Sequence, residues 1–270
     1  MTHGSVDSPR PVQFDPGLDI QFRRDPMGFG FGHGVFGPQP EHRSLDAIRP
    51  SLHDPNCAGP DPVYTIAMDV GRNEDREELQ RRMLLFGIVI YASGRLGDEP
   101  VRSQGHVHAI SPHSGWSAPE LFEIWEGKAI IYAQEKSGDD PGRCFAIEAG
   151  PGQRVVMPPA WSHYVVNADS SAPLIFGAWC DRQYGFDYTQ TRAHRGLAWF
   201  PQLVASGEIT WTANQNYSAS KLQHRKARAY PELGLSSERP IYENLCRDPE
   251  AIQWVSDPAR FRELWPHFEP

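Results

Sequence analysis

The sequence predicts an all-β protein, a sandwich or barrel of short strands. Apolar runs rich in β-branched and aromatic residues recur between residues 63 and 179, and turns rich in glycine, proline and aspartate separate them. Strands at this spacing are typical of sandwiches and barrels rather than of alternating strand–helix units. With 270 residues, the chain is long enough for one such domain with extensions, or for two domains at most.

The predicted strands follow one another closely along the chain. They cover residues 63–70, 83–92, 99–110, 120–133, 144–148, 154–157, 164–167 and 174–179. Gly127-Lys128 provides a turn within the fourth run, and Pro158-Pro159 ends a ladder because proline donates no backbone hydrogen bond. Residues 73–82 are charged and are expected to form a loop or a short helix.

Two extensions flank this region, and we predict three segments: residues 1–62, 63–200 and 201–270. The first extension is expected to pack on the barrel, with a helical turn at 44–49. Its glycine-rich stretch at 28–37 favours a surface loop over a phosphate-binding loop, since no strong strand precedes it and no helical pattern follows. The second extension is expected to hold a strand at 209–213 and a helix over 248–264, where apolar residues have helical spacing.

Composition excludes several classes of protein. The net charge is -8 and no stripe of lysine and arginine is present, which argues against a nucleic-acid partner. No apolar run approaches the ~18 residues of a membrane helix, so no membrane partner is expected. The four cysteines are scattered, which argues against a zinc ribbon or a disulfide framework. The start of the chain has no basic-then-apolar signal pattern, and we therefore expect a cytoplasmic protein.

One set of residues indicates a metal site. His106 and His108 are two residues apart on a predicted strand, so their imidazoles should face the same way. Glu120 opens the following strand, and His163 lies near the start of a later one. An HxH pair alone is more often a surface or packed pair. The complete set of nitrogen and oxygen donors suits one divalent ion, Fe, Mn, Zn, Ni or Co, with positions left open for water or substrate.

These residues and their turns resemble the two motifs of the cupin superfamily. In the first motif, six residues separate Glu120 from Gly127, while Pro100 stands where a glycine is usual and Gly97 lies nearby. In the second motif, Gly152 and Pro158 have the usual gap, and Ala160 replaces a glycine. His163 and Asn167 complete that motif. The resemblance implies a cupin jelly-roll β-barrel.

The stretches SQGHVH at 103–108, ELFEIWEGK at 120–128 and PGQRVVMPPAWSHYVVN at 151–167 are similar to the cupin-type glucose-6-phosphate isomerase family, as is Phe186-Asp-Tyr188. The resemblance covers about residues 83–200. It implies an aldose–ketose isomerase of glycolysis and gluconeogenesis, acting on glucose 6-phosphate and fructose 6-phosphate, and a homodimer. In that family the metal ion binds the open-chain sugar, and the implied ligands here are His106, His108, Glu120 and His163.

The resemblance also implies roles for individual residues. Glu120 would be the catalytic base that moves a proton between C1 and C2 through an enediol(ate). Tyr188 would lie at the substrate as a catalytic and binding residue, although a packed aromatic is a common alternative. Ser103 would lie at the phosphate end, or else bond to the backbone. Gly105 would let the backbone approach the ligand.

Several polar residues of the family are replaced here, which indicates a different or less polar substrate. A threonine becomes Ile88 or Val89, two tyrosines become Phe122 and Cys180, and a histidine becomes Phe186. An insertion at 111–118 reshapes the mouth of the site, and its His113 and Trp116 either touch substrate or lie in a solvent-exposed loop.

Other functions are compatible with the same motif. The chain is alternatively another metal-dependent cupin enzyme, such as a dioxygenase or a decarboxylase, with an apolar substrate. It is also compatible with an isomerase or epimerase of a different sugar, or with a non-catalytic sugar-binding cupin. The sequence leaves open the native metal and the choice between proton and hydride transfer.

Overall fold

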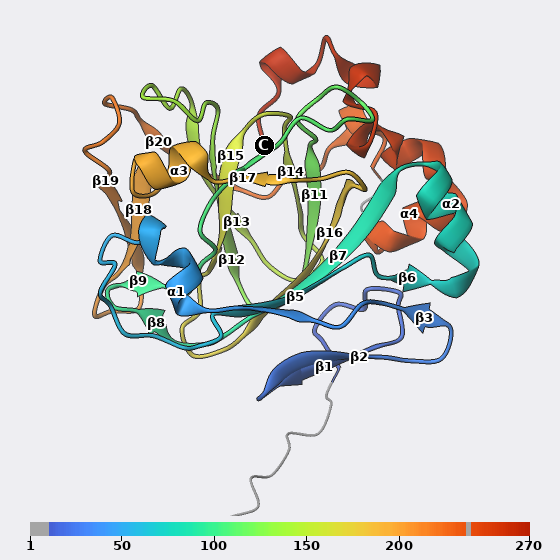
Figure 1. Cartoon of the computed structure of the whole chain (residues 1–270), viewed down its shortest axis with the longest axis horizontal. Helices are drawn as coiled ribbons and strands as arrows, with labels where there is room; N and C mark the ends of the chain where they lie inside the picture. Colours follow the sequence, from blue (N-terminus) through green and yellow to red (C-terminus); the bar gives the residue numbers. More distant parts are fainter. Residues whose placement is uncertain (1–10, 236–238) are drawn as a thin grey trace, which may run out of the picture.

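The computed structural model describes residues 11–235 and 239–270, and two β-sheets form its centre (Figure 1). The first sheet has six strands in the order β14-β11-β16-β7-β5-β4, and the second has four in the order β15-β12-β13-β20. The strands of the first sheet are β4 (Glu41–Arg43), β5 (Tyr64–Met68), β7 (Leu84–Tyr91), β11 (Glu120–Glu126), β14 (Arg154–Met157) and β16 (Leu174–Asp181). Those of the second are β12 (Ala129–Gln134), β13 (Cys144–Ala149), β15 (Ser162–Asn167) and β20 (Leu222–Lys226).

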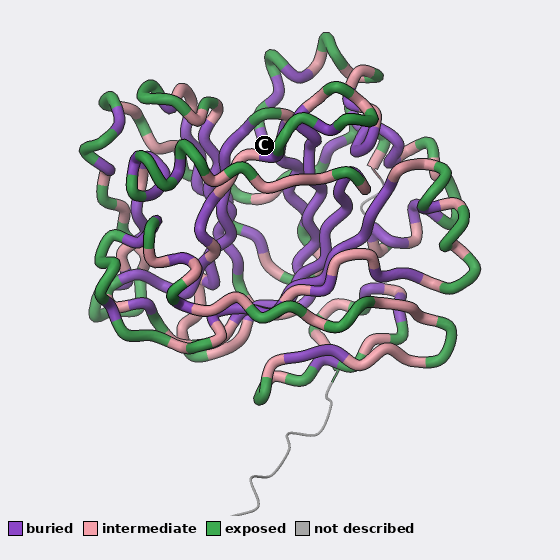
Figure 2. Tube along the Cα trace, in the orientation of Figure 1, coloured by how far each residue is buried: buried purple, intermediate pink, exposed green. Residues whose placement is uncertain are grey.

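The hydrophobic core lies between these sheets and also on their outer faces. In β7, Leu85, Val89 and Tyr91 belong to the cluster between the sheets, whereas Phe86 and Ile88 belong to the outer cluster. Because side chains alternate along a strand, a strand buried on both faces is apolar throughout. Figure 2 shows this as purple strands in the centre with exposed segments around them. The all-β jelly-roll class predicted from the sequence is confirmed.

Segments of the C-terminal extension cover the outer faces of both sheets. On the six-stranded sheet, Tyr242 of α4 (Ile241–Arg247) stacks on Trp179, with ring centroids 5.4 Å apart. On the four-stranded sheet, Trp211 stacks on Tyr132 with a centroid distance of 5.7 Å. Trp211 belongs to β19 (Ile209–Ala213), which pairs with β18 (Trp199–Leu203). The strand predicted at 209–213 is confirmed.

Smaller elements connect and border the two sheets. The remaining strands are β1 (Ile20–Arg24), β2 (Met27–Phe31), β3 (Val35–Phe36), β6 (Gly71–Arg72), β8 (Arg95–Leu96), β9 (Glu99–Pro100), β10 (Val107–His108) and β17 (Phe186–Asp187). The other α-helices are α1 (Leu45–Ile48), α2 (Arg76–Arg81) and α3 (Thr189–Ala193). The 3-10 helices are η1 (Arg49–Ser51), η2 (Asn73–Asp75), η3 (Pro231–Leu233), η4 (Pro249–Val255), η5 (Pro258–Phe261) and η6 (Trp265–His267).

Two predictions for the first half of the chain are wrong. The stretch at 28–37 is largely not a surface loop, because β2 pairs with β1 in a hairpin and β3 pairs with β6. The stretch at 99–110 is not one strand but two short ones, β9 and β10. Gly105 has a φ of +88°, which breaks the extended backbone between them. The ambiguous segment at 73–82 is helical, as η2 and α2.

The prediction that the C-terminal segment contains a helix is confirmed, but a single helix over 248–264 is wrong. The structure has the 3-10 helices η4 and η5 there, and the α-helix of this extension, α4, lies just before them. Pro258 interrupts the hydrogen-bonding pattern, so the apolar spacing is used by separate 3-10 turns. The division at residues 62 and 200 stays a prediction, and residues 1–10 of the first segment lie outside the described residues.

The described helices include none that is long and apolar enough to cross a membrane. All four cysteines are free thiols.

A buried ion pair anchors the C-terminal extension to β11. Arg154 Nε donates to Glu123 Oε2 at 3.0 Å, and the Glu123 side chain has no exposed surface. The Ile241 backbone N–H donates to the same carboxylate, with N···O distances of 3.1 and 3.2 Å. The first residue of α4 therefore donates a hydrogen bond to the buried Glu123 carboxylate of β11.

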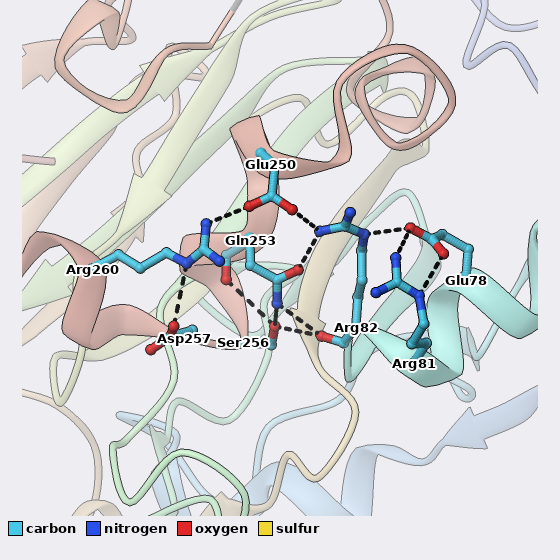
Figure 3. Close-up of polar contacts among 8 residues, drawn as sticks. All are labelled: Glu78, Arg81, Arg82, Glu250, Gln253, Ser256, Asp257 and Arg260. Carbon is cyan, nitrogen blue, oxygen red and sulfur yellow. Dashed lines mark hydrogen bonds and ion pairs between the residues drawn. The ribbon is translucent and has the colours of Figure 1, made fainter.

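A second, exposed network ties η4 and η5 to α2, as Figure 3 shows. Arg82 donates to Glu250 at 2.6 Å and to Gln253 at 2.7 Å. Arg260 donates to the other oxygen of Glu250 at 2.7 Å. The Ser256 hydroxyl donates to the Arg82 carbonyl at 2.7 Å. The ion pairs of Glu250 are exposed and contribute little individually, whereas the Gln253 and Ser256 side chains of this network are buried.

Replacing the buried carboxylate should be strongly destabilising. In Glu123→Gln the interior loses the negative charge that Arg154 Nε and the Ile241 N–H both contact, which should lower the free energy of unfolding by about 3 kcal/mol. Urea denaturation measures this, with Glu250→Gln in the exposed network as the matched control. An equal shift in the two variants would contradict the anchoring role of Glu123.

The exposed network should respond to acid. Hydrogen bonds from Arg260 and Arg82 lower the pKa of Glu250 from 4.5 to about 2. A lowered folded-state pKa contributes stability above pH 4.5, and that contribution is lost as the pH falls towards about 2. The difference in thermal midpoint between the wild type and Glu250→Gln should therefore shrink across this range. Glu263→Gln, an exposed change in the same extension, should show no such trend.

Candidate metal centre

The ligand set predicted from the sequence lies together at one point between the sheets. His106 and His108 come from the segment around β10, Glu120 opens β11, and His163 is the second residue of β15. One ligand atom from each lies within 4.8 Å of all the others. Glu120 Oε2 is 3.1 Å from His163 Nε2 and 3.2 Å from His108 Nε2. This geometry could hold a metal ion.

Backbone contacts explain how the two histidines of the HxH pair converge outside a continuous strand. His106 and His163 exchange backbone hydrogen bonds of 3.1 and 2.9 Å. His108 pairs with Phe186 of β17. The chain therefore stays extended at His106 and His108, which keeps both imidazoles on one side, with ring centroids 5.1 Å apart.

Two ring nitrogens of the cluster have no hydrogen-bond partner among the described residues. Nε2 of His106 and Nε2 of His108 are both buried, and neither meets the geometry of a hydrogen bond. The 3.2 Å approach of His108 Nε2 to Glu120 is therefore a close contact without the alignment of a hydrogen bond. Unpartnered buried nitrogens are uncommon, and two of them beside a carboxylate fit the donor set of a transition-metal ion.

The electrostatics of the cluster favour the metal-binding protonation states of Glu120 and His106. Burial would raise the pKa of the Glu120 carboxyl, but the neighbouring His108 and His163 imidazoles outweigh burial and hold its pKa well below the usual range. Burial lowers the pKa of the His106 imidazole well below its usual value. For His108, burial is outweighed by the neighbouring Glu120, and its pKa is raised. The carboxylate is thus anionic and His106 neutral, the forms that donate to metals.

The insertion at 111–118 supports the centre from outside. His108 Nδ1 lies 2.8 Å from the Ala118 carbonyl, which fixes the ring with its Nε2 towards the cluster. The Ser117 hydroxyl donates to the His108 carbonyl at 2.6 Å and accepts from the Ala160 N–H at 3.1 Å. Sequence reasoning missed this role, because no local pattern links Ser117 to His108.

A cavity of about 60 Å³ adjoins the centre. His106, Glu120 and His163 form part of its wall. Most of the remaining lining is apolar: Ile66, Met68, Val89, Phe122, Val165, Phe176, Ala178 and Phe186. The polar lining consists of Arg43, Tyr64, Tyr91, Ser103, Gln104 and Tyr188. Phe186, Tyr188 and Arg43 are half-buried, so they lie nearer to solvent than the buried Glu120 and form the mouth.

The predicted substrate residues occupy different positions. Ser103 and Tyr188 line the cavity, and the Tyr188 ring lies 5.9 Å from the His106 ring. Ser103 also accepts a hydrogen bond from the Val165 N–H at 3.2 Å. Gly105 is not among the described lining residues and packs against Leu197 and Tyr164. The substrate-binding roles of these residues stay predictions.

The replaced family positions give the cavity its apolar character. Val89 faces the cavity, whereas Ile88 points into the outer cluster. Phe122 and Phe186 line the cavity, and the Cys180 thiol donates to Glu120 Oε1 at 3.4 Å. His113 and Trp116 are absent from the described lining, and His113 is exposed.

Sequence reasoning missed four polar lining residues: Arg43, Tyr64, Tyr91 and Gln104. The two tyrosines lie within predicted strands, where alternation could have placed Tyr64 on the same face as Ile66 and Met68. Arg43 comes from the N-terminal extension, and no local signal relates it to the motif residues.

Comparison with known proteins agrees with this geometry. The family description "Glucose-6-phosphate isomerase (GPI)" matches residues 50–220, more than half of the chain. The chain belongs to the glucose-6-phosphate isomerase family. The resemblance predicted from the motifs is confirmed, and the coarse activity it supports is that of a sugar-phosphate isomerase. No curated protein matches the sequence.

Solved structures that resemble this family member are cupin proteins of low sequence identity. Vicilin from Corylus avellana is 10% identical, with a TM-score of 0.35, over 48% of this chain and 33% of its own. An oxalate oxidase in complex with glycolate is 16% identical, with a TM-score of 0.28, over 37% of this chain and 43% of its own. An oxalate decarboxylase from Bacillus subtilis is 17% identical, with a TM-score of 0.31, over 46% of this chain and 27% of its own. Each match spans less than two thirds of the solved chain.

Gly105 directly precedes His106, and replacing this glycine should destabilise the protein. A Cβ there would lie 3.1 Å from Leu197 at a φ of +88°. Gly105→Ala should lower the free energy of unfolding by about 1–3 kcal/mol. Gly115→Ala is the matched control, because its φ of +72° adds similar strain with no atom within 4 Å of the new Cβ. Denaturant unfolding of both variants separates packing from backbone strain, and equal losses would contradict the packing constraint.

Proposed function

We propose that the chain is a metal-dependent aldose–ketose isomerase that interconverts glucose 6-phosphate and fructose 6-phosphate. Family membership supports the sugar-phosphate isomerase activity. The observation that carries the metal dependence is the pair of buried, unpartnered Nε2 atoms of His106 and His108 beside the Glu120 carboxylate. Such nitrogens are costly in the interior unless a ligand occupies them.

His106, His108, Glu120 and His163 would hold the ion. Three imidazoles and one carboxylate suit Fe, Mn, Zn, Ni or Co, and which of them is native depends on availability as well as affinity. When bound, the ion would supply Lewis acidity that polarises the sugar carbonyl and stabilises negative charge on its oxygen. The donor set leaves coordination positions for the substrate, as a catalytic centre requires.

Glu120 is the proposed base. It is anionic in the folded protein, so one of its oxygens can take the proton from C2 of the open-chain aldose and return it to C1. The hydroxyl proton on O2 passes to O1 in the same isomerisation, through an enediol(ate). The Cys180 thiol, which donates to Oε1, helps to fix the orientation of the carboxylate.

Tyr188 is the proposed orienting residue. Burial raises the pKa of its phenol, so the hydroxyl stays protonated near neutral pH and can donate to a sugar oxygen. Around it, Phe122, Phe176 and Phe186 provide apolar walls that exclude water from the intermediate.

The same apolar walls favour a second candidate, a dioxygenase or decarboxylase acting on a less polar substrate. Val89, Phe122 and Phe186 replace polar residues of the family, and all three face the cavity. Oxygen uptake or carbon dioxide release by the metal-loaded protein would distinguish these reactions from isomerisation. The cytoplasmic location, the homodimer and the place in glycolysis and gluconeogenesis stay predictions from the resemblance.

Metal removal and replacement of Glu120 test the proposal. Chelation should abolish the interconversion of fructose 6-phosphate and glucose 6-phosphate, and adding back one of the five candidate ions should restore it. Glu120→Gln should reduce kcat by about 100-fold or more. Proton NMR measures turnover, and mass spectrometry of the purified protein measures retained metal.

Glu148→Gln, which removes an exposed carboxylate from β13, is the control and should keep full activity. Incorporation of solvent deuterium at C2 of the glucose 6-phosphate formed from fructose 6-phosphate would support proton transfer. The proposal would be wrong if the chelated protein kept full activity. It would also be wrong if the metal-loaded protein did not convert fructose 6-phosphate at high enzyme concentration.

A further inference from the structure

Arg43 of the N-terminal extension lies in the wall of the cavity. It is the last residue of β4, and it pairs directly with Tyr64 on β5. Tyr64, Ile66 and Met68 alternate along β5 and line the cavity, and Arg43 lies on the same face. Of the described residues that line the cavity, Arg43 is the only lysine or arginine. It lies outside residues 50–220, the part of the chain matched by the family.

The Arg43 guanidinium has an N–H group without a hydrogen-bond partner among the described residues. Its Nε is buried and makes no hydrogen bond. The guanidinium interacts with the Tyr64 hydroxyl, and its carbon lies 6.0 Å from the centre of the Tyr64 ring. Glu41, two residues earlier on β4, forms no ion pair with it within 4 Å among the described residues. A half-buried cation with an unused donor at the mouth of a cavity is suited to an anionic ligand.

Neighbouring hydroxyls extend this polar wall into the cavity. Tyr64 and Tyr91 stack with ring centroids 4.9 Å apart. Tyr91 interacts in turn with the Ser103 hydroxyl. Burial raises the pKa of Tyr64 to about 12, so its hydroxyl stays protonated and can donate a hydrogen bond. Arg43, Tyr64, Tyr91 and Ser103 thus form one polar wall in an otherwise apolar cavity.

The fold holds Arg43 firmly in this place. The Val63 N–H donates to the Arg43 carbonyl at 2.8 Å. The Asp61 carboxylate accepts from the Leu45 N–H at 3.3 Å, just beyond β4. Arg192, the nearby cation beside Tyr188, is already engaged, since Gln104 accepts from its Nε at 2.8 Å in the amide orientation that satisfies both side-chain atoms. Arg43 belongs to the described lining of the cavity and Arg192 does not, so Arg43 is the better placed cation for a ligand there.

We propose that Arg43 binds the phosphate group of the substrate, so that the N-terminal extension determines the preference for phosphorylated sugars. This inference rests on the proposed isomerase function. A guanidinium presents paired donors that match a phosphate, and the Tyr64 hydroxyl adds a third donor. The phosphate would lie at the mouth, and the neutral open-chain end of the sugar would reach the buried Glu120.

Kinetics with two substrates test the role of Arg43. Arg43→Gln should lower kcat/KM for fructose 6-phosphate by roughly 10- to 100-fold, mainly through KM, because a charge-assisted hydrogen bond is lost. The slower turnover of unphosphorylated fructose should change less than 3-fold. Arg43→Lys keeps the charge without the planar fork and should fall between the wild type and Arg43→Gln. Arg81→Gln removes an exposed cation from α2 and should match the wild type.

Calorimetric titration with inorganic phosphate tests the same inference without turnover. Wild type and Arg81→Gln should bind phosphate, and Arg43→Gln should bind it roughly 10-fold more weakly or not at all. All variants should retain the same metal content and circular dichroism spectrum.

Equal phosphate binding by wild type and Arg43→Gln, or no binding by wild type, would overturn the inference. Equal losses for fructose and fructose 6-phosphate would overturn it as well. If the wild type binds phosphate through Arg43 but isomerises no sugar phosphate, the proposed function fails and the anion site stands.

Discussion

A buried carboxylate surrounded by imidazoles is the constraint on which the arrangement of this protein depends. Removing a charged group from water is expensive, and Glu120 is tolerated because His108 and His163 lie within 3.2 Å of it. Those partners come from β10 and β15, elements that share no local sequence with β11. The centre can form only if the two sheets keep these strands in register. Apolar packing on both faces of each sheet provides that rigidity.

Each extension is held by hydrogen bonds between its backbone and a buried ion pair. At the N-terminal side, the buried Arg102–Glu99 pair is completed by the Ser51 carbonyl and the His53 N–H, at 2.7 Å each. At the C-terminal side, the Glu123–Arg154 pair is completed by the Ile241 N–H.

Each ion pair also bonds to the backbone of an extension, so an extension cannot leave without removing hydrogen bonds from a buried charge. Arg102 lies just before His106, and Glu123 just after Glu120, so each extension is fastened close to a metal ligand in the sequence.

Local patterns sufficed to predict much of the fold and the cluster, because strand alternation is local. His106 and His108 share a face even though their segment is not a continuous strand, since backbone bonds to His163 keep it extended. The hairpin at Met27–Phe31 was missed although phenylalanine alternates with glycine there, because the glycines suggested a loop. At the C-terminus, apolar spacing could not distinguish an α-helix from successive 3-10 turns.

Arg43 could not be predicted, because its position depends on the register of β4 against β5.

The cavity shows why the ligand set alone does not determine the reaction. Imidazoles and a carboxylate serve many chemistries, so the walls must select the substrate. Phe122 and Phe186 make part of the lining apolar. Tyr64, Tyr91 and Arg43 face the same space from β5, β7 and β4 and provide polar groups. A polar substrate would therefore bind with its charged end towards the extension and its reactive end towards Glu120.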